Sequence, residues 1–245
     1  MKKISFLILT AAMSLASVIS VKAQTADEII SKHLAATGGE ANWKKINSVK
    51  MIGSVNAGGT EIPITITNIQ KKAFRMDMVF NGMNNYQIIT NTEGWSYFPA
   101  YGQPKPEATP AETLKQAQES LDLMPMVDYK SKGIKVAYLG KDDVEGTECH
   151  KLKFTYASGK EETIYIDASN YYHIRSVIKA NANGKEVEQT SNFSNFQKLP
   201  EGVVFPMSVD EGMGAFAIKT IEVNKPIDES IFKPTEVAAG KDAKK

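Results

Sequence analysis

The chain has 245 residues, a formal net charge of +1 and one cysteine, Cys149. A nearly neutral chain lacks the electrostatic footprint that nucleic-acid binding requires, and a single cysteine excludes an intramolecular disulfide. The length suits one large domain, whose core must hold the fold without covalent cross-links.

The N-terminal segment, residues 1–23, is predicted to be a secretory signal peptide. Met1, Lys2 and Lys3 make a short basic start, residues 4–19 are mostly apolar, and small residues precede a cleavage site after Ala23. A membrane anchor is disfavoured because the apolar run is short for a bilayer span and no stop-transfer pattern follows. We therefore expect a periplasmic protein with one domain over residues 24–235 and a disordered, charged tail over residues 236–245.

The first predicted helix covers residues 25–37. Thr25 and Glu28 form a capping-box pattern, apolar residues recur at helical spacing, and Gly38 with Gly39 ends the helix. His33 falls on or beside the apolar stripe. A packed histidine is favoured there over a ligand, because no second metal-binding residue accompanies it.

Short alternating strands fill most of the remaining chain. The clearest, residues 74–80, is followed by Asn81-Gly82, which predicts a tight hairpin, and further turns are expected near Asp142-Asp143 and at Asn183-Gly184. The spacing predicts about eleven strands in a mainly β fold. With two helices beside them, they are expected to form an unclosed antiparallel β-barrel with a helical lid.

The predicted lid begins with a proline-rich loop at residues 99–110, which is unsuited to helix or central strand. A second helix is expected over residues 111–124, stopped by Pro125. Its narrow apolar stripe is formed by the predicted lid residues Leu114, Ala117, Leu121 and Met124. We expect residues 99–126 to be a movable cover, and the alternative is a permanently packed helix.

A sheet of this size has more apolar faces than two helices can cover, which predicts an internal cavity. Its walls can equally be ordinary core, and an error of one residue in a strand's register would move a whole set to the other face. The predicted ligand-binding residues are Met76, Met78, Phe80, Tyr86, Ile88, Trp95, Tyr97, Leu152 and Phe154.

The sequence offers few residue sets for catalysis. His33, His150 and His173 lie far apart without metal-binding spacing, and neither a nucleophile elbow nor a phosphate-binding glycine loop is present. Cys149 and His150 are adjacent, but neighbouring strand residues point to opposite faces. We therefore predict no catalytic residue, no metal and no cofactor, with a hydrolase built on Cys149 and His150 as a weaker rival.

Seven short motifs lie at residues 72–77, 91–95, 143–148, 165–168, 193–196, 202–206 and 228–234. Their order resembles the periplasmic outer-membrane lipoprotein-sorting (LolA/LolB-like) superfamily, and most of all its compact Bacteroidetes-type members. The resemblance implies an unclosed barrel, a concave hydrophobic cavity and a helical lid. It also places Arg75 where carriers often keep an arginine after an aromatic residue.

The function expected from these patterns is that of a monomeric carrier or binding protein for lipid or acylated (lipoprotein) ligands, with a possible role in outer-membrane lipoprotein sorting. About ten buried methylenes would offer about 8 kcal/mol before association costs, which suits reversible carriage. The alternative is a sensor or assembly module that docks a protein partner in the envelope.

Overall fold

The computed structural model describes residues 25–182, 185–212 and 214–235. Its strands are β1 (Ser48–Ala57), β2 (Thr60–Ile69), β3 (Ala73–Phe80), β4 (Met83–Thr90), β5 (Gly94–Tyr97), β6 (Glu107–Ala108), β7 (Lys135–Val144), β8 (Thr147–Thr155), β9 (Glu161–Asp167), β10 (His173–Ala182), β11 (Lys185–Lys198), β12 (Val204–Asp210) and β13 (Ala215–Val223). The α-helices are α1 (Ala26–Ala36), α2 (Glu40–Trp43) and α3 (Ala111–Ala117), and the 3-10 turns are η1 (Pro99–Tyr101), η2 (Gln118–Leu121) and η3 (Glu229–Phe232). The predicted signal peptide, the C-terminal tail and the Asn183-Gly184 turn lie outside the described residues.

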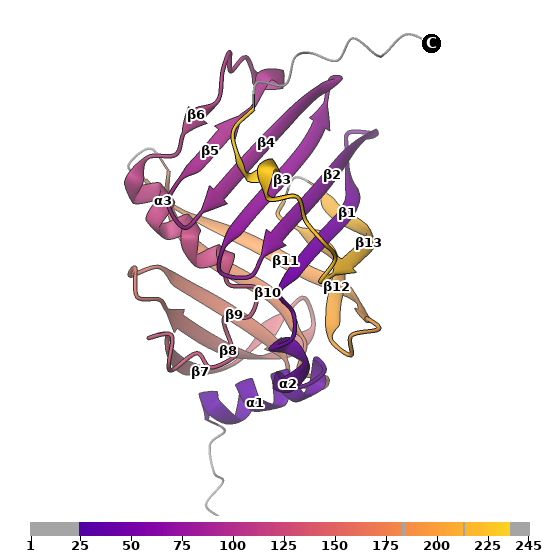
Figure 1. Ribbon diagram of the computed structural model, residues 1–245. Coiled ribbons are helices and arrows are strands. Elements are labelled where there is room, and N and C mark those ends of the chain that lie inside the picture. The colour runs from indigo at the N-terminus through magenta and orange to yellow at the C-terminus, as the bar shows by residue number, and fades with distance from the viewer. Residues whose placement is uncertain (1–24, 183–184, 213, 236–245) are drawn as a thin grey trace, which may run out of the picture.

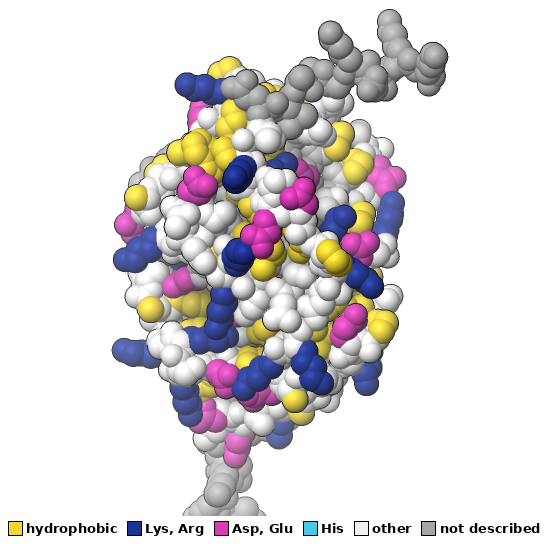
Figure 2. All heavy atoms as spheres, viewed as in Figure 1, with side chains coloured by type: hydrophobic (Ala, Val, Ile, Leu, Met, Phe, Trp, Pro, Cys, Tyr) yellow, Lys and Arg dark blue, Asp and Glu magenta, His cyan; other side chains and the backbone are white. Residues whose placement is uncertain are grey.

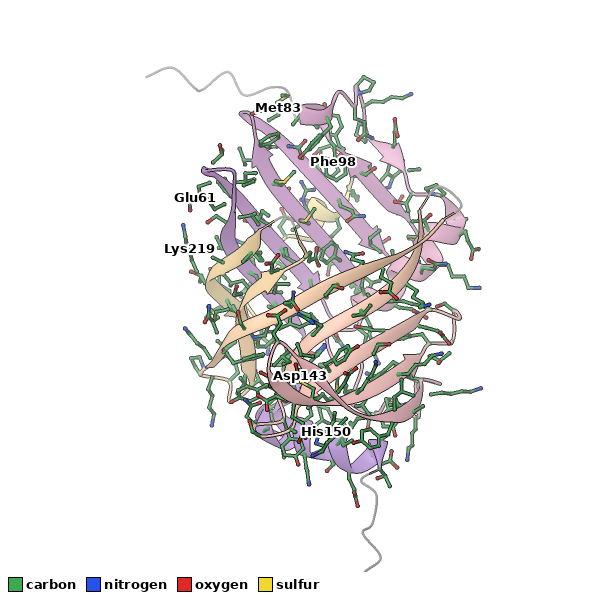
Figure 3. All side chains as sticks on the ribbon, turned by 180° about the vertical axis from the view of Figure 1, so that it is seen from behind. Glu61, Met83, Phe98, Asp143, His150 and Lys219 are labelled. Carbon is green, nitrogen blue, oxygen red and sulfur yellow. The ribbon has the colours of Figure 1, made fainter. Side chains whose placement is uncertain are left out.

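All thirteen strands form one antiparallel sheet, in the order β6-β5-β4-β3-β2-β1-β13-β12-β11-β10-β9-β8-β7. Two meanders therefore meet where β1 pairs with β13, and β6 and β7 remain as the two edges of the sheet. The sheet curls, so that β10 and β11 cross behind β2–β4 in Figure 1 and in front of them in Figure 3. The predicted unclosed antiparallel architecture is confirmed, with thirteen strands in place of about eleven.

Two-residue turns set the register of the hairpins. Asn81 and Gly82 both have positive φ angles, 51° and 71°, which is the type I′ geometry that matches the twist of paired strands. The turn predicted near Asp142-Asp143 is wrong, because β7 continues to Val144 and the chain reverses at Glu145-Gly146. Asp142 instead lies within the strand, where its carboxylate meets Lys151 of β8 at 2.8 Å.

Helix α1 starts as its sequence predicts. The Thr25 side chain accepts a hydrogen bond from the Glu28 amide at 3.2 Å, and the Glu28 carboxylate accepts one from the Thr25 amide at 3.3 Å. At the other end, the Gly39 amide donates to the Leu34 carbonyl at 2.7 Å, and Gly38 adopts a φ of +112° that favours glycine.

Replacing Thr25 with alanine is expected to lower the free energy of unfolding by about 1 kcal/mol, because an amide of the first turn loses its partner. Chemical denaturation of the variant measures the loss, and Thr25→Ser, which keeps the hydroxyl, serves as the control. Equal stability of the alanine and serine variants would show that the cap contributes nothing.

The second predicted helix is shorter than expected. Helix α3 ends at Ala117 and continues as the 3-10 turn η2 to Leu121, so residues 122–124 are not helical. Asp122 has extended backbone angles, and its carboxylate accepts a hydrogen bond from the Met124 amide at 3.0 Å. This local bond competes with helix continuation and ends the helix before Pro125 is reached.

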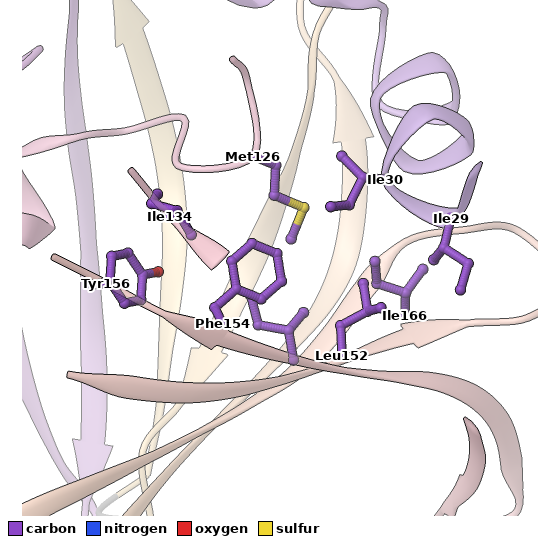
Figure 4. Close-up of a cluster of buried hydrophobic side chains, with 9 residues drawn as sticks. Ile29, Ile30, Met126, Ile134, Leu152, Phe154, Tyr156 and Ile166 are labelled. Carbon is purple, nitrogen blue, oxygen red and sulfur yellow. The ribbon is translucent and has the colours of Figure 1, made fainter. Parts of the chain in front are cut away.

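A first apolar core lies between α1 and the β8–β9 part of the sheet. Ile29 and Ile30 of α1 pack over Leu152 and Phe154 of β8, which have no solvent exposure (Figure 4). Met126, which follows the 3-10 turn η2, closes the same cluster.

A C-terminal strap, residues 224–235, covers the outer side of the other half of the sheet. In Figure 1 it runs in front of β2–β4, on the side away from β10 and β11. Its Phe232 packs with Tyr86 and Ile88 of β4, and the Arg75 guanidinium donates to the Ile231 carbonyl at 2.5 Å. The arginine singled out by the resemblance therefore ties this strap to the sheet.

Candidate functional site

The curled sheet holds a cavity of about 280 Å³ with walls that are mainly apolar. Met51, Phe193, Val209 and Ile218 line it from β1, β11, β12 and β13. Leu34 of α1, the capping residue Thr37 that follows α1, and Trp43 of α2 close one side, and residues 123–127 also line it. We call residues 118–127 the roof segment. A mainly apolar wall with few polar groups is typical of sites for small apolar molecules.

The strand register shows that the apolar floor extends beyond this cavity. Residues directly opposite each other in a ladder share a face, and so do residues two apart in a strand. The face that begins at Leu152 and Phe154 of β8 continues strand by strand through Ile164, Ser176, Ser191, Phe193, Val209, Phe216, Val55, Ile62, Ile64 and Met78. We call this the inner face.

The inner face divides the predicted ligand-binding residues. Met76, Met78 and Phe80 of β3 belong to it and are half-buried, although they are large and apolar. Half-exposed methionine and phenylalanine side chains on the inside of a curled sheet leave apolar surface open to a ligand. Leu152 and Phe154 belong to the inner face too, but they are fully buried in the cluster with Ile29, Ile30 and Met126 and are core.

The other predicted cavity residues lie on the opposite, outer face of the sheet. Tyr86 and Ile88 pair with Tyr97 and Trp95, and all four belong to the cluster under the strap. Tyr86 also donates its hydroxyl hydrogen to the Thr235 carbonyl at 2.9 Å. The predicted residues therefore do not form one wall. The prediction chose side chains of β3 that point to the inner face and side chains of β4 that point to the outer face.

The predicted lid residues are also divided. Met124 lines the cavity and Leu121 is buried, whereas Leu114 and Ala117 are half-buried on α3. The roof segment is fixed to the sheet at several points by polar contacts. Gln70 bonds both the Asp122 carboxylate and the Leu123 amide at 2.7 Å, and Lys132 meets Asp122 at 2.6 Å.

Two histidines that are far apart in the sequence meet at the cavity. His33 comes from α1 and His173 from the start of β10, and both line it. His33 Nδ1 lies 2.9 Å from the Tyr171 carbonyl oxygen, and the His173 ring packs on Phe193 with centroids 4.7 Å apart. Burial lowers the pKa of both imidazoles, that of His173 to about 4, so both are neutral at pH 7.

A chain of hydrogen bonds extends from His173 into the protein. His173 Nε2 lies 3.0 Å from the Arg175 carbonyl oxygen and 2.9 Å from Ser176 Oγ. Ser176 donates to the Glu162 carboxylate at 2.6 Å, and Tyr156 donates to the same carboxylate at 2.7 Å. Burial raises the pKa of Tyr156, so the phenol stays protonated and acts as a donor.

Cys149 and His150 do not make a catalytic pair. Cys149 is fully buried, and burial raises its pKa to about 11, which keeps the thiol protonated and unreactive. His150 lies instead against Tyr138, with Nδ1 3.3 Å from the phenol oxygen. As the alternation of a strand predicts, the two side chains have different neighbours.

Sequence reasoning missed the cavity residues of β11–β13 and the pairing of His33 with His173. Phe193, Val209 and Ile218 did belong to recognisable strands, but nothing in the sequence showed which face would meet α1. The spacing of about 140 residues between the histidines is bridged only by the folded sheet.

Charge is mixed on the outside of the molecule. Figure 2 shows lysine and arginine side chains interspersed with aspartate and glutamate over the face that carries the strap. At the end of the sheet far from α1, Figure 3 places Met83 and Phe98, while Asp143 and His150 lie near α1.

None of the helices in residues 25–182, 185–212 and 214–235 combines the length and hydropathy that a membrane crossing requires.

Comparison with known proteins finds no matching family model and no matching curated protein. Solved structures do match. A LolA superfamily protein from Nitrosomonas europaea aligns with a TM-score of 0.53 and 11% identity over 86% of this chain and 98% of its own. A DUF1329 family protein from Desulfovibrio piger aligns with a TM-score of 0.53 and 13% identity, covering 86% and 98%.

A putative outer membrane lipoprotein-sorting protein domain from Vibrio parahaemolyticus is also found, with a TM-score of 0.49 and 14% identity over 84% of this chain and 94% of its own. At these identities the likeness is one of architecture, and the closer resemblance to Bacteroidetes-type members stays a prediction. The chain shares its fold with a LolA superfamily protein, as the order of its motifs predicts.

Proposed function

We propose that the protein is a periplasmic carrier or binding protein for a lipid or an acyl chain, which it holds in the cavity beneath the roof segment. The observation that carries the proposal is the apolar lining of a cavity inside a curled sheet, with partly exposed Met76, Met78 and Phe80 on the same face of that sheet. The fold shared with a LolA superfamily protein supports it, and the N-terminal pattern of residues 1–23 supports export to the periplasm.

Physical chemistry favours carriage over catalysis at this site. The cavity walls make dispersion contacts with a bound apolar molecule and remove its surface from water. Each methylene buried in this way contributes about 0.8 kcal/mol to binding. His173 and Ser176 do not form a nucleophile–base pair. His173 Nε2 faces the Arg175 carbonyl and carries a hydrogen, and Ser176, 2.9 Å from this nitrogen, donates its own hydrogen to Glu162. Binding without bond breaking is the outcome this arrangement supports.

Blocking the cavity is expected to weaken ligand binding. Val209→Phe adds an aromatic ring to the cavity wall, and we expect it to weaken binding of the uncharged apolar fluorophore N-phenylnaphthylamine by about tenfold or more. Fluorescence titration measures the dissociation constant. Val79→Phe is the matched control, since Val79 is 42% exposed on β3 and lies outside the cavity lining.

The wild-type protein and the Val79→Phe variant should bind the fluorophore equally well. A wild-type protein that ignores the fluorophore, or a Val209→Phe variant that binds as the wild type does, would contradict the proposal. Thermal denaturation of both variants separates a blocked cavity from a lost fold.

A second candidate function, docking of an envelope protein partner, is favoured by one observation. Strand β7 is an edge of the sheet and exposes Leu139, which keeps 51% of its surface in contact with solvent. Edge strands with apolar side chains can pair with another chain. Leu139→Lys should then abolish capture of the partner while leaving fluorophore binding unchanged, and loss of both properties would argue against a separate docking surface.

A further inference from the structure

We propose that His33 and His173 form the polar end of the cavity and select an amphiphile whose headgroup donates a hydrogen bond and carries no negative charge, such as a hydroxyl group. This inference rests on the proposed function, because it names the class of lipid that the apolar cavity would accept. It follows from the hydrogen bonds that fix the two imidazole rings.

The tautomer of His33 is set by its backbone partner. A carbonyl oxygen can only accept, so the Nδ1 atom that lies 2.9 Å from the Tyr171 carbonyl must carry the hydrogen. A neutral imidazole has one donor and one acceptor nitrogen. Nε2 of His33 is therefore a hydrogen-bond acceptor.

The tautomer of His173 is set in the same way but with the nitrogens exchanged. Nε2 faces the Arg175 carbonyl at 3.0 Å and therefore carries the hydrogen. Ser176 Oγ, at 2.9 Å from the same nitrogen, gives its own hydrogen to Glu162 and can only accept here. Nδ1 of His173 is left as an acceptor.

Both acceptor nitrogens belong to side chains that line the cavity. Within the described residues, Nε2 of His33 and Nδ1 of His173 take part in none of the hydrogen bonds found. Among those residues, the buried side-chain atoms without a partner are Asn68 Oδ1 and Glu119 Oε2. The two histidine nitrogens are not among these fully buried atoms, and both rings line the cavity, so we infer that a molecule held there bonds to them.

The surrounding charges disfavour an anionic headgroup. Glu162 is connected to His173 through Ser176, and its carboxylate lies close enough to act electrostatically on that ring. A carboxylate headgroup would meet two acceptors and a nearby negative charge without gaining a donor. A hydroxyl group can donate to either imidazole and leaves no charge to be desolvated.

The test compares amphiphiles of equal chain length. Decanol and decanoate compete with N-phenylnaphthylamine at pH 8 for the wild type, His33→Leu, His173→Leu and His33→Gln. We expect decanol to displace the fluorophore from the wild type at about tenfold lower concentration than decanoate. His33→Leu should reduce this preference to about twofold, whereas His33→Gln, which keeps an acceptor, should retain most of it.

The outcomes separate the inference from the proposed function. Fluorophore binding with no preference for decanol, or a preference unchanged in both His33→Leu and His173→Leu, overturns the headgroup assignment and leaves the apolar cavity in place. Tighter binding of decanoate than of decanol also overturns it, since that result would assign an anion site. Failure of the fluorophore itself to bind the wild type overturns the proposed function and this inference together.

Discussion

Phe154→Ala is expected to lower the free energy of unfolding by about 3–5 kcal/mol, the typical cost of removing a large aromatic side chain from a closed core. Phe154 has no solvent exposure and lies beneath α1 with Ile29, Ile30 and Met126 (Figure 4). Its ring fills space that the surrounding strand and helix cannot close, so the substitution leaves a cavity. Urea denaturation measures the loss.

Phe80→Ala is the matched control for this prediction. Phe80 lies on the inner face but is half-buried, so truncation removes fewer contacts and should cost less than about 2 kcal/mol. Comparing Phe154→Ala with Phe80→Ala distinguishes a core residue from one that faces the ligand, although the sequence predicts both as cavity residues. Equal destabilisation by both substitutions would show that the inner face near β3 is packed core.

Asp122→Asn is expected to lower the free energy of opening the roof segment by about 2 kcal/mol, which raises amide exchange there by about 30-fold. The Asp122 and Lys132 side chains are each only 16% exposed and meet at 2.6 Å. Removing the charge of Asp122 leaves the mostly buried ammonium group of Lys132 without its counter-ion. Hydrogen exchange at residues 118–127 measures the change.

The control is Asp128→Asn, in an exposed ion pair with Lys44 whose side chains are about half open to solvent. Such a pair contributes little, so exchange in the roof segment should change by less than about threefold. If Asp122→Asn instead accelerates exchange equally in β8 and β9, the roof opens only with global unfolding. That result would favour the permanently packed alternative over a movable cover.

The same carboxylate gives a pH dependence with a definite sign. Burial raises the pKa of Asp122, but hydrogen bonds from Lys132, Gln70 and the Met124 amide outweigh it and hold the pKa below its ordinary value. A lowered folded-state pKa means that the pair stabilises fully above the unfolded-state pKa of 3.8, and that its contribution is lost as the pH falls through the lowered value.

Sequence patterns predicted local structure correctly where contacts between residues close in sequence determine the backbone conformation. The capping box at Thr25 and Glu28 and the type I′ turn at Asn81-Gly82 each involve contacts within four residues, and both are confirmed. The turn near Asp142-Asp143 failed because Glu145-Gly146 supplies the positive φ angles that a tight hairpin needs. Aspartates are common in turns, but Asp142 lies within β7, where it pairs with Lys151 of β8.

The site was harder to predict because it depends on strand parity and on distant segments. Met76 and Tyr86 occupy neighbouring strands, yet the register places them on opposite faces, and the strap that covers Tyr86 comes from the other end of the chain. His33 and His173 become neighbours only after the second meander returns beneath α1. Both contacts join segments that are distant in the sequence, so they depend on how the whole sheet is paired.

The most direct test of lipid binding is native mass spectrometry of the protein purified from its own host, followed by solvent extraction and analysis of what is released. The account predicts a population whose mass exceeds that of the chain by one lipid, lost on extraction and absent from Val209→Phe. A chain that carries no extractable lipid and also takes up no N-phenylnaphthylamine after purification would contradict it.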